Sequence, residues 1–313
     1  MSKTPILPAT PDAVARAAEV LRGGGLVAIP TETVYGLAVR ADSDAAVARL
    51  YAAKGRPATN PLIVHVPDLG AAERWAAPMP ELAARLAGLF WPGPLTLVVP
   101  AAAGLSPRAL GGGDTVGLRA PDHPVALALL RECGLPLAAP SANASGRLSP
   151  TTAEAVLDTL DGLIDLVLDG GACAVGIEST VLDACCDPPR VLRPGVLTAE
   201  QLADALGAPV LGVAGEQGPG PARSPGLLTR HYAPSVPLVV GGEAGSGDFS
   251  VQWGPGAADA ALPLEPRAAA AALFAELRRA ERSGARRIVV AEPPPGPEWA
   301  GIRDRLRRAS AAE

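Results

Sequence analysis

Lysine and asparagine are almost missing from this chain. Lys3 and Lys54 are the only lysines among its 27 basic residues, and Asn60 and Asn143 are the only asparagines. This bias is typical of compositional drift, in which arginine replaces lysine wherever either residue would serve. Lys54 therefore indicates a position that needs a compact ammonium group, because the guanidinium of arginine is a planar fork with a different reach.

Aromatic residues and cysteines are scarce as well. Only 3% of the residues are aromatic and the formal net charge is −5, which disfavours a protein that coats nucleic acid. The cysteines form no C-x-x-C motif, and we expect them to be buried thiols in a reducing cytosol. They are Cys133, Cys173, Cys185 and Cys186.

The motifs of several common enzyme classes are missing. There is no G-x-x-x-x-G-K-[ST] phosphate loop, no G-x-G-x-x-G after a strand and no G-x-S-x-G elbow. The three histidines, His65, His123 and His231, have no zinc-ligand spacing to another His or Cys. These absences disfavour a P-loop enzyme, a dinucleotide oxidoreductase, a serine hydrolase of that type and a zinc enzyme. Neither a secretory h-region nor a membrane-spanning apolar run is evident, so we expect a cytoplasmic protein without membrane contact.

The 313 residues are enough for two domains, and the hydrophobic content of 48% can supply their cores. Apolar runs alternate with helical patterns over residues 1–207, which predicts an α/β domain with a twisted mixed sheet. Glycine and proline dominate residues 208–236, which we interpret as a linker that acts as a lid. Strand and helix patterns return over residues 237–313 and predict a small, Rossmann-like α/β domain.

The expected strands and helices follow from short apolar runs and capping signals. One helix is expected to begin after Asp42 or Ser43, to contain Lys54 and to end at Gly55. The expected strands are 25–31, 61–66, 95–99, 115–120, 135–139, 163–169, 179–184, 190–194, 237–241, 249–253 and 286–293. The other expected helices lie near 80–90, 123–133, 151–161, 198–206, 266–283 and 297–310.

Polar residues gather where the expected strands end. The stretches are PTETVYG (30–36), KGRPATN (54–60), PSANASGRLSPT (140–151), GIESTV (176–181) and RVLRPG (190–195). His65 lies inside an apolar strand, and Arg119 ends another. Ligands of open α/β sheets bind outside strand ends, where cationic forks suit phosphates and carboxylates.

Each of these residues also has a structural explanation. Thr31 and Thr33 can be turn residues, Lys54 and Arg56 a solvated helix end, and His65 a core histidine. Ser141, Asn143 and Ser145 can cap the next helix, Ser179 and Thr180 can be plain strand residues, and Arg193 a surface ion pair. Taken together the structural explanation weakens, because both asparagines, one of two lysines and one of three tyrosines lie in these few stretches.

The combination of stretches closely resembles the Sua5/YrdC family, the threonylcarbamoyl-adenylate synthases. The resemblance spans about residues 20–196, and SPGLLTRHYAP and IRDRLRRAS are similar to the longer, two-domain Sua5 form. The matching segments are IPTETVYGL, AAKGRPATNPLIVHV, FWPGPLTLV, VGLRAPDHPVA, LAAPSANASGRLSPT, LDGG, GIESTVLD and VLRPG.

The resemblance implies a nucleotidyl transfer. L-Threonine, bicarbonate or CO2 and ATP, with Mg²⁺ held by phosphate oxygens and water, would give L-threonylcarbamoyl-AMP and pyrophosphate. The product would feed the modification of adenosine 37 in tRNAs. The resemblance leaves open a weak contact with tRNA or with the threonylcarbamoyl transferase complex, and it implies no protein metal site.

The same resemblance assigns roles to residues of this chain. Lys54 and Arg56 would act on the reacting groups, and we infer that Lys54 is a mobile charge near the carbamate and phosphates. Threonine would contact Thr33, His65, Arg119, Ala139 and Ser179. ATP would contact Arg56, Asn60, Thr115, Ser141, Asn143, Ser149, Arg193 and Tyr232.

Two other functions stay open at this point. The first is an RNA-binding module, which the acidic charge balance disfavours. The second is a carbamoyl-adenylate enzyme that uses another amine or a carbamoyl phosphate donor.

Overall fold

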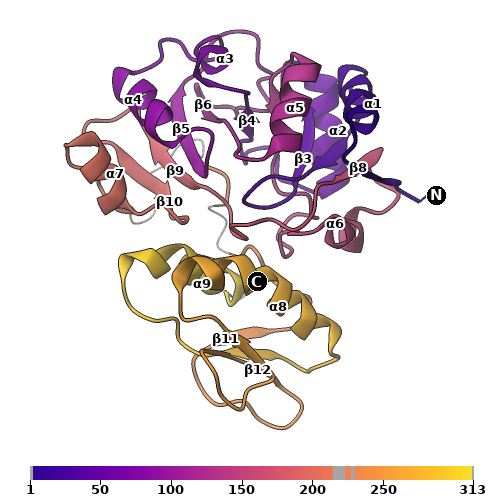
Figure 1. Ribbon diagram of the computed structural model, residues 1–313, viewed down its shortest axis with the longest axis vertical. Coiled ribbons are helices and arrows are strands. Elements are labelled where there is room, and N and C mark those ends of the chain that lie inside the picture. Colours follow the sequence, from indigo (N-terminus) through magenta and orange to yellow (C-terminus); the bar gives the residue numbers. More distant parts are fainter. Residues whose placement is uncertain (1–2, 214–222, 227–229, 312–313) are drawn as a thin grey trace.

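The computed structural model describes residues 3–213, 223–226 and 230–311. It contains two α/β units, which lie one above the other in Figure 1. The first carries a ten-stranded mixed sheet and the second a four-stranded sheet. The expected fold class, a twisted mixed-sheet unit followed by a small α/β unit, is confirmed.

The large sheet has the strand order β1-β8-β2-β3-β7-β4-β6-β5-β9-β10. Parallel and antiparallel neighbours alternate irregularly, so strand ends from distant parts of the sequence meet at one edge. The strands are β1 (Ile6–Pro8), β2 (Val27–Ile29), β3 (Gly36–Arg40), β4 (Ile63–His65), β5 (Leu95–Pro100), β6 (Thr115–Arg119), β7 (Leu137–Ala138), β8 (Leu166–Asp169), β9 (Thr180–Asp183) and β10 (Arg190–Arg193).

Helices cover both faces of this sheet because its strands present apolar side chains alternately to each side. Val27 and Ile29 belong to the hydrophobic cluster that contains side chains of α1 and α5, whereas Ala28 between them belongs to the cluster that contains side chains of α2, α4, α6 and α7. Ser43 caps α2 and Gly55 ends it in the left-handed conformation, as the sequence predicted. The helices are α1 (Pro11–Arg22), α2 (Asp44–Lys54), α3 (Leu69–Glu73), α4 (Glu81–Phe90), α5 (Pro124–Cys133), α6 (Ala153–Leu160) and α7 (Ala199–Leu206).

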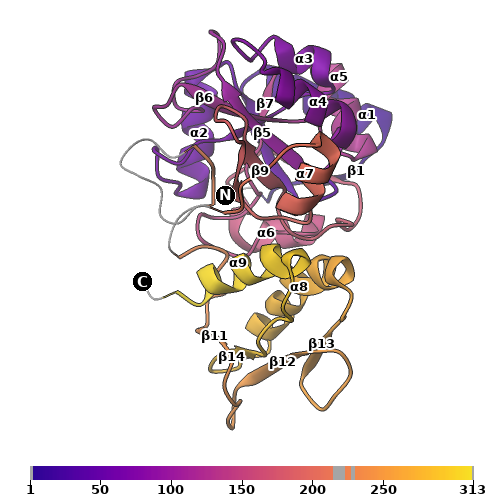
Figure 2. The same ribbon diagram turned by 90° about the vertical axis from the view of Figure 1, so that its left-hand side faces the viewer.

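The second unit has a wholly parallel sheet in the order β11-β14-β12-β13. Its helices α8 and α9 lie between this sheet and the first unit (Figure 2). The elements are β11 (Leu238–Val240), β12 (Phe249–Trp253), β13 (Ala260–Leu262), α8 (Pro266–Arg282), β14 (Ile288–Val290), the 3-10 turn η1 (Pro297–Trp299) and α9 (Ala300–Ala309).

The two units share a hydrophobic cluster. Val34, Leu148 and Ile177 of the first unit pack with the core side chains of α8 and α9. Gly176 approaches α8 so closely that a Cβ there would lie 2.4 Å from the carbonyl oxygen of Ala270. The interface is therefore tight. The expected linker 208–236 lies partly outside the described residues, and the expected domain boundaries stay a prediction.

Several elements were not predicted from the sequence. They are β1, α1, β3, α3 and β13, although Thr10 and Pro11 are an ordinary signal for the start of α1. The expectation of four buried thiols is wrong for two of them. Cys133 and Cys173 are buried, but Cys185 and Cys186 are exposed, because they lie in the turn between the antiparallel strands β9 and β10. No helix among the described residues is long and apolar enough to cross a membrane.

Candidate active site

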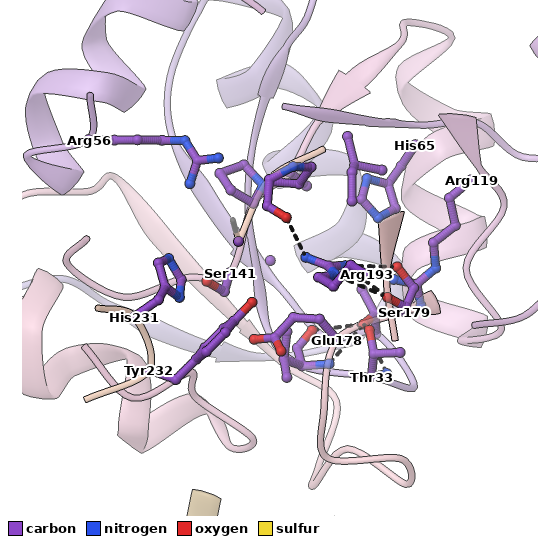
Figure 3. Close-up of a pocket in the computed structure, with 18 residues that line it drawn as sticks. Thr33, Arg56, His65, Arg119, Ser141, Glu178, Ser179, Arg193, His231 and Tyr232 are labelled. Carbon is purple, nitrogen blue, oxygen red and sulfur yellow. Dashed lines mark hydrogen bonds between the residues drawn. The ribbon is translucent and has the colours of Figure 1, made fainter. Parts of the chain in front are cut away.

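One pocket lies where the ends of several strands meet, and His231 and Tyr232 of the chain segment that joins the two units lie on one side of it (Figure 3). Its side chains come from loops and strand ends between residues 31 and 193 and from the joining segment. The lining residues are Thr31, Thr33, Val34, Gly36, Arg56, Ile63, His65, Arg119, Ala139, Pro140, Ser141, Glu178, Ser179, Arg193, Pro225, Gly226, His231 and Tyr232.

His65 and Arg119 form one wall of the pocket because β4 and β6 are parallel neighbours in which these two residues pair. The Arg119 guanidinium donates from Nε to the carbonyl oxygen of Gly93 (3.1 Å). Its Nη2 lies 2.6 Å from Oε1 of Glu32, an ion pair without hydrogen-bond geometry. The buried cation is thus paired, and its Nη2 can still donate to an arriving carboxylate.

The imidazole of His65 is neutral at physiological pH. Burial, with a smaller contribution from Arg119, lowers the pKa of His65 to about 3. Its Nδ1 has no hydrogen-bond partner among the described residues. A buried polar atom without a hydrogen-bond partner destabilises the folded protein. A polar group of a ligand at this wall would supply the missing hydrogen bond and remove that cost.

Thr33 also lines the pocket and lies on a short turn that Thr31 organises. The Thr31 hydroxyl accepts from the backbone N–H groups of Thr33 (3.1 Å) and Val34 (3.3 Å). The two threonine hydroxyls are 2.8 Å apart. Thr31 is therefore the turn residue that the structural explanation expects, and it holds Thr33 at the pocket.

Arg193 crosses the middle of the pocket from the end of β10. Its Nη2 donates to the carbonyl oxygen of Ser179 (3.0 Å) and to the Ser179 hydroxyl (3.1 Å). The same hydroxyl lies 2.8 Å from that of Thr96. Arg193 is thus a buried and oriented cation, and not the surface ion pair of the alternative explanation.

Arg56 supplies a second oriented cation from the loop after α2. It donates to the carbonyl oxygens of Asn60 (3.2 Å) and Pro61 (2.8 Å). Burial lowers the pKa of Arg56 to about 10, so the side chain stays charged at neutral pH. The Asn60 side chain is buried beside this loop but does not line the pocket.

Lys54 does not line the pocket. Its Nζ donates to the carbonyl oxygens of Ser141 (2.5 Å) and Asn143, and so fixes the loop that carries Ser141. Burial, followed by Arg56, lowers the pKa of Lys54 well below its usual value. The structure thus shows a held amine instead of the expected mobile charge, and substrate contact by Lys54 stays a prediction.

Sequence reasoning missed Glu178 and His231, which both line the pocket. Glu178 is buried, accepts from the Ser149 hydroxyl (2.5 Å), and pairs with Arg305 of α9 (2.7 Å). His231 packs edge-on against Tyr232 with ring centroids 4.0 Å apart. Glu178 directly precedes Ser179, an expected threonine contact, in GIESTV, and this position was the available signal.

The structure brings most of the expected site residues together. Lining the pocket are Thr33, Arg56, His65, Arg119, Ala139, Ser141, Ser179, Arg193 and Tyr232. Not lining it are Lys54, Asn60, Thr115, Asn143 and Ser149. Lys54 and Ser149 nevertheless bond to lining residues, and the Asn143 amide donates to the carbonyl oxygens of Ala144 and Arg147 within the loop.

The charge of the pocket is positive. Three guanidinium groups and one carboxylate, that of Glu178, belong to its described lining residues. The described part of the chain contains no group of three or more His, Cys, Asp or Glu side chains that could hold a metal ion. Such a pocket suits an anion with several oxygens beside a small polar molecule.

Comparison with known proteins gives two family matches. The Sua5/YciO/YrdC family model, described as "Telomere recombination", matches residues 19–195. The model described as "Threonylcarbamoyl-AMP synthase, C-terminal domain" matches residues 197–311.

Individual relatives agree with these matches. A threonylcarbamoyl-AMP synthase of Bacillus subtilis is 50% identical over 230 residues, which cover 72% of this chain and 66% of the relative. One of Pyrococcus abyssi is 47% identical over 230 residues, with the same shares. The matched region thus spans just under two thirds of either relative.

A solved structure extends the likeness to nearly the whole chain. The crystal structure of P. abyssi Sua5 complexed with L-threonine matches with a TM-score of 0.90 and 36% identity, over 98% of both chains. The chain therefore belongs to the Sua5/YrdC family of threonylcarbamoyl-AMP synthases, in its two-domain Sua5 form.

Proposed function

We propose that this chain makes L-threonylcarbamoyl-AMP and pyrophosphate from L-threonine, bicarbonate or CO2, and ATP. The observation that carries the proposal is the gathering of threonine-type contacts and buried guanidinium groups in one pocket. The relatives' name and the threonine complex of P. abyssi Sua5 support it.

Threonine would bind at the wall formed by His65 and Arg119. Arg119 would hold its carboxylate, because its Nη2 has no hydrogen-bond partner among the described residues and can donate to it. The neutral His65 and the hydroxyls of Thr33 and Ser179 would receive the polar groups of the amino acid. Ala139 would add backbone contact, as the resemblance implies.

ATP would bind across Arg56, Ser141 and Arg193, with Tyr232 closing the site. Both arginines are fixed by backbone carbonyls before any ligand arrives, so little reorganisation is needed when phosphate charge develops. Asn60, Thr115, Asn143 and Ser149 stay predicted ATP contacts that would require a local shift. An arriving triphosphate would raise the pKa of Lys54 again.

The reaction requires positioning more than a protein nucleophile. A threonine carbamate oxygen would attack the α-phosphate of ATP in line, and pyrophosphate would leave. Mg²⁺ would be coordinated by phosphate oxygens and water, which fits a pocket in which the single acidic side chain among the described lining residues, Glu178, is already paired. The metal would neutralise phosphate charge, while Arg56 and Arg193 would orient the triphosphate of ATP.

The joining segment would act as a lid over the labile mixed anhydride. Pro225, Gly226, His231 and Tyr232 line the pocket although they follow the catalytic unit in sequence. The carbonyl oxygen of Pro225 accepts from Arg193 (3.5 Å). A closed lid of this kind excludes water from the product. Residues 214–222 and 227–229 of the expected lid lie outside the described residues.

Pyrophosphate release tests the proposal directly. The protein would be incubated with ATP, Mg²⁺, bicarbonate and each amino acid in turn, and threonine alone should stimulate release. Stimulation by another amine would favour the other carbamoyl-adenylate reaction. Salt-dependent tRNA binding without any threonine-dependent turnover would favour the RNA-binding module. The cytoplasmic location and the use of the product in tRNA modification belong to the same proposal.

A further inference from the structure

Arg305 of α9 reaches out of the second unit and ends against Glu178 and Tyr232, two residues that line the pocket. Its side chain is 1% exposed. Nε donates to the Glu178 carboxylate (2.7 Å), Nη2 to the carbonyl oxygen of Glu178 (3.2 Å) and Nη1 to that of Pro194 (3.0 Å). One guanidinium thus holds two backbone positions of the pocket. Glu178 directly precedes Ser179, and Pro194 directly follows Arg193.

The face of the same guanidinium supports Tyr232. Its central carbon lies 4.9 Å from the centroid of the Tyr232 ring, within the range of a cation–π contact. Tyr232 is 1% exposed and has a φ of 60°, the left-handed region that a tyrosine seldom adopts. Such a conformation persists only where surrounding contacts determine it, and Arg305 provides one of them.

We propose that Arg305 is a positioning residue through which the C-terminal unit sets the active-site conformations of Glu178 and Tyr232. The inference rests on the proposed function and adds a role for the second unit. The C-terminal unit then contributes directly to the structure of the pocket. Its helix α9 supplies the cation that keeps the Glu178 carboxylate and the Tyr232 ring in place.

The packing around this contact leaves little room for an alternative arrangement. A Cβ on Gly301 of α9 would lie 2.8 Å from the Ile177 side chain and 2.9 Å from the carbonyl oxygen of Gly195. A Cβ on Gly176 would lie 2.4 Å from α8. The segment that carries Glu178 is therefore held between two helices of the second unit, so its position depends on that unit.

The charges around Glu178 show what Arg305 does electrostatically. Burial alone would raise the pKa of Glu178, but Arg305 and then Arg193 lower it, with help from Ser149. Arg305 contributes the largest of these lowering effects. Other titratable groups that interact with this carboxylate are Lys54 at the end of α2, and His231 and Tyr232 of the joining segment, while Asp304 pairs with Arg305 itself. Removal of Arg305 therefore leaves a buried carboxylate that binds a proton more readily.

The test compares Arg305→Met with Arg307→Met, a matched control on the same helix. Arg307 is 70% exposed and pairs with Asp304, which Arg305 also contacts. We expect Arg305→Met to lower kcat for threonine-dependent pyrophosphate release about a hundredfold, as misplacement of reacting groups does. Arg305→Lys should recover part of the loss, and Arg307→Met should retain wild-type activity.

Two further measurements separate positioning from loss of stability. As the pH is lowered, the activity of Arg305→Met should begin to fall at a higher pH than the activity of the wild type. The reason is that the pKa of Glu178 is higher without Arg305, so this carboxylate is protonated at a higher pH. The double variant Glu178→Gln/Arg305→Met should lack this shift. Backbone hydrogen exchange should accelerate at residues 176–179 and 230–233 in Arg305→Met but not in Arg307→Met.

The outcomes distinguish this inference from the proposed function. If Arg305→Met keeps wild-type kcat and pH profile, or if exchange at 176–179 is unchanged, the positioning role is refuted. If the wild type itself shows no threonine-dependent turnover, the proposed function fails. The exchange comparison still tests the positioning role in that case.

Discussion

Lys54 holds the loop of Ser141, with 2.5 Å between its Nζ and the carbonyl oxygen of that residue. The same nitrogen donates to the carbonyl oxygen of Asn143, so one lysine and one asparagine of this lysine-poor and asparagine-poor chain lie together. The loop presents Ser141 to the pocket. The retention of lysine is explained by this geometry, because a compact amine can donate to two carbonyls that a planar fork would push apart.

Lys54→Arg should therefore lower both stability and activity. Two buried carbonyl oxygens would lose their donor, and an unsatisfied buried polar group costs about 1–3 kcal/mol. We expect a lower melting temperature, and a turnover reduced by about tenfold or more because the loop that presents Ser141 would be misplaced. Arg49→Lys, the reverse exchange at an exposed position of α2, should alter neither property. Full pyrophosphate release by Lys54→Arg would contradict the role of Lys54.

Arg119→Lys should affect threonine selectively. The substitution keeps the positive charge beside Glu32 but removes the fork that can bind a carboxylate. Loss of one charge-assisted hydrogen bond predicts a KM for threonine about 10- to 100-fold higher, with little change for ATP. Steady-state kinetics with either substrate varied provides the measurement. Arg40→Lys, at the partly exposed ion pair with Asp42, is the control. Equal increases in both KM values would argue against a threonine site at Arg119.

Gly226→Ala should disturb the lid. Gly226 has a φ of 82°, and a Cβ there would lie 2.4 Å from the Tyr232 hydroxyl oxygen. The tyrosine or the Pro225–Gly226 turn must move, so we expect weaker ATP binding and a shorter lifetime of the enzyme-bound product. Gly212→Ala is a matched control, because a Cβ at that position meets no atom within 4 Å. Unchanged ATP binding and product lifetime in Gly226→Ala would show that the lid does not depend on this contact.

The free energy of unfolding should fall as the pH falls below about 6.5. Burial lowers the pKa of His65 and of His231 to about 3, whereas their ordinary value is 6.5. Between these values the unfolded chain binds protons that the folded chain does not. Each histidine then contributes a slope of about 1.4 kcal/mol per pH unit.

Urea unfolding between pH 7.5 and 4.5 measures this slope. His231→Gln should reduce it by about one proton's contribution. His123→Gln should reduce it less, because His123 is only partly buried and its pKa is lowered to a smaller extent. A slope that His231→Gln leaves unchanged would mean that His231 is charged in the folded protein.

Most strands and helices could be predicted from sequence because their apolar periods and caps are local signals. Ser43, Gly55 and the apolar run before His65 define α2 and β4 without any tertiary information. By contrast β3 follows PTETVY directly, and its short sequence GLAVR was hidden by the polar stretch before it. Strand order in a mixed sheet is a non-local property, and no local pattern predicts it.

The candidate site likewise contains residues that local sequence patterns predict and residues whose position depends on tertiary contacts. Oriented residues at strand ends, such as His65, Arg119 and Arg193, follow from strand prediction plus the rule that ligands bind at such ends. The position of Lys54 behind the Ser141 loop could not be predicted, because it depends on how α2 packs against a loop 87 residues away. The contact of Glu178 with Arg305 joins residues separated by 127 positions and belongs to the interface between units.

The most direct measurement of the central claim is mass spectrometry of the product made with ¹³C-bicarbonate. The purified protein, ATP, Mg²⁺, L-threonine and labelled bicarbonate should yield a nucleotide that contains AMP, threonine and one ¹³C atom, together with an equal amount of pyrophosphate. A product that lacks either the label or the threonine, or ATP consumption that yields ADP and phosphate, would contradict the claim that this pocket joins a threonine carbamate to AMP.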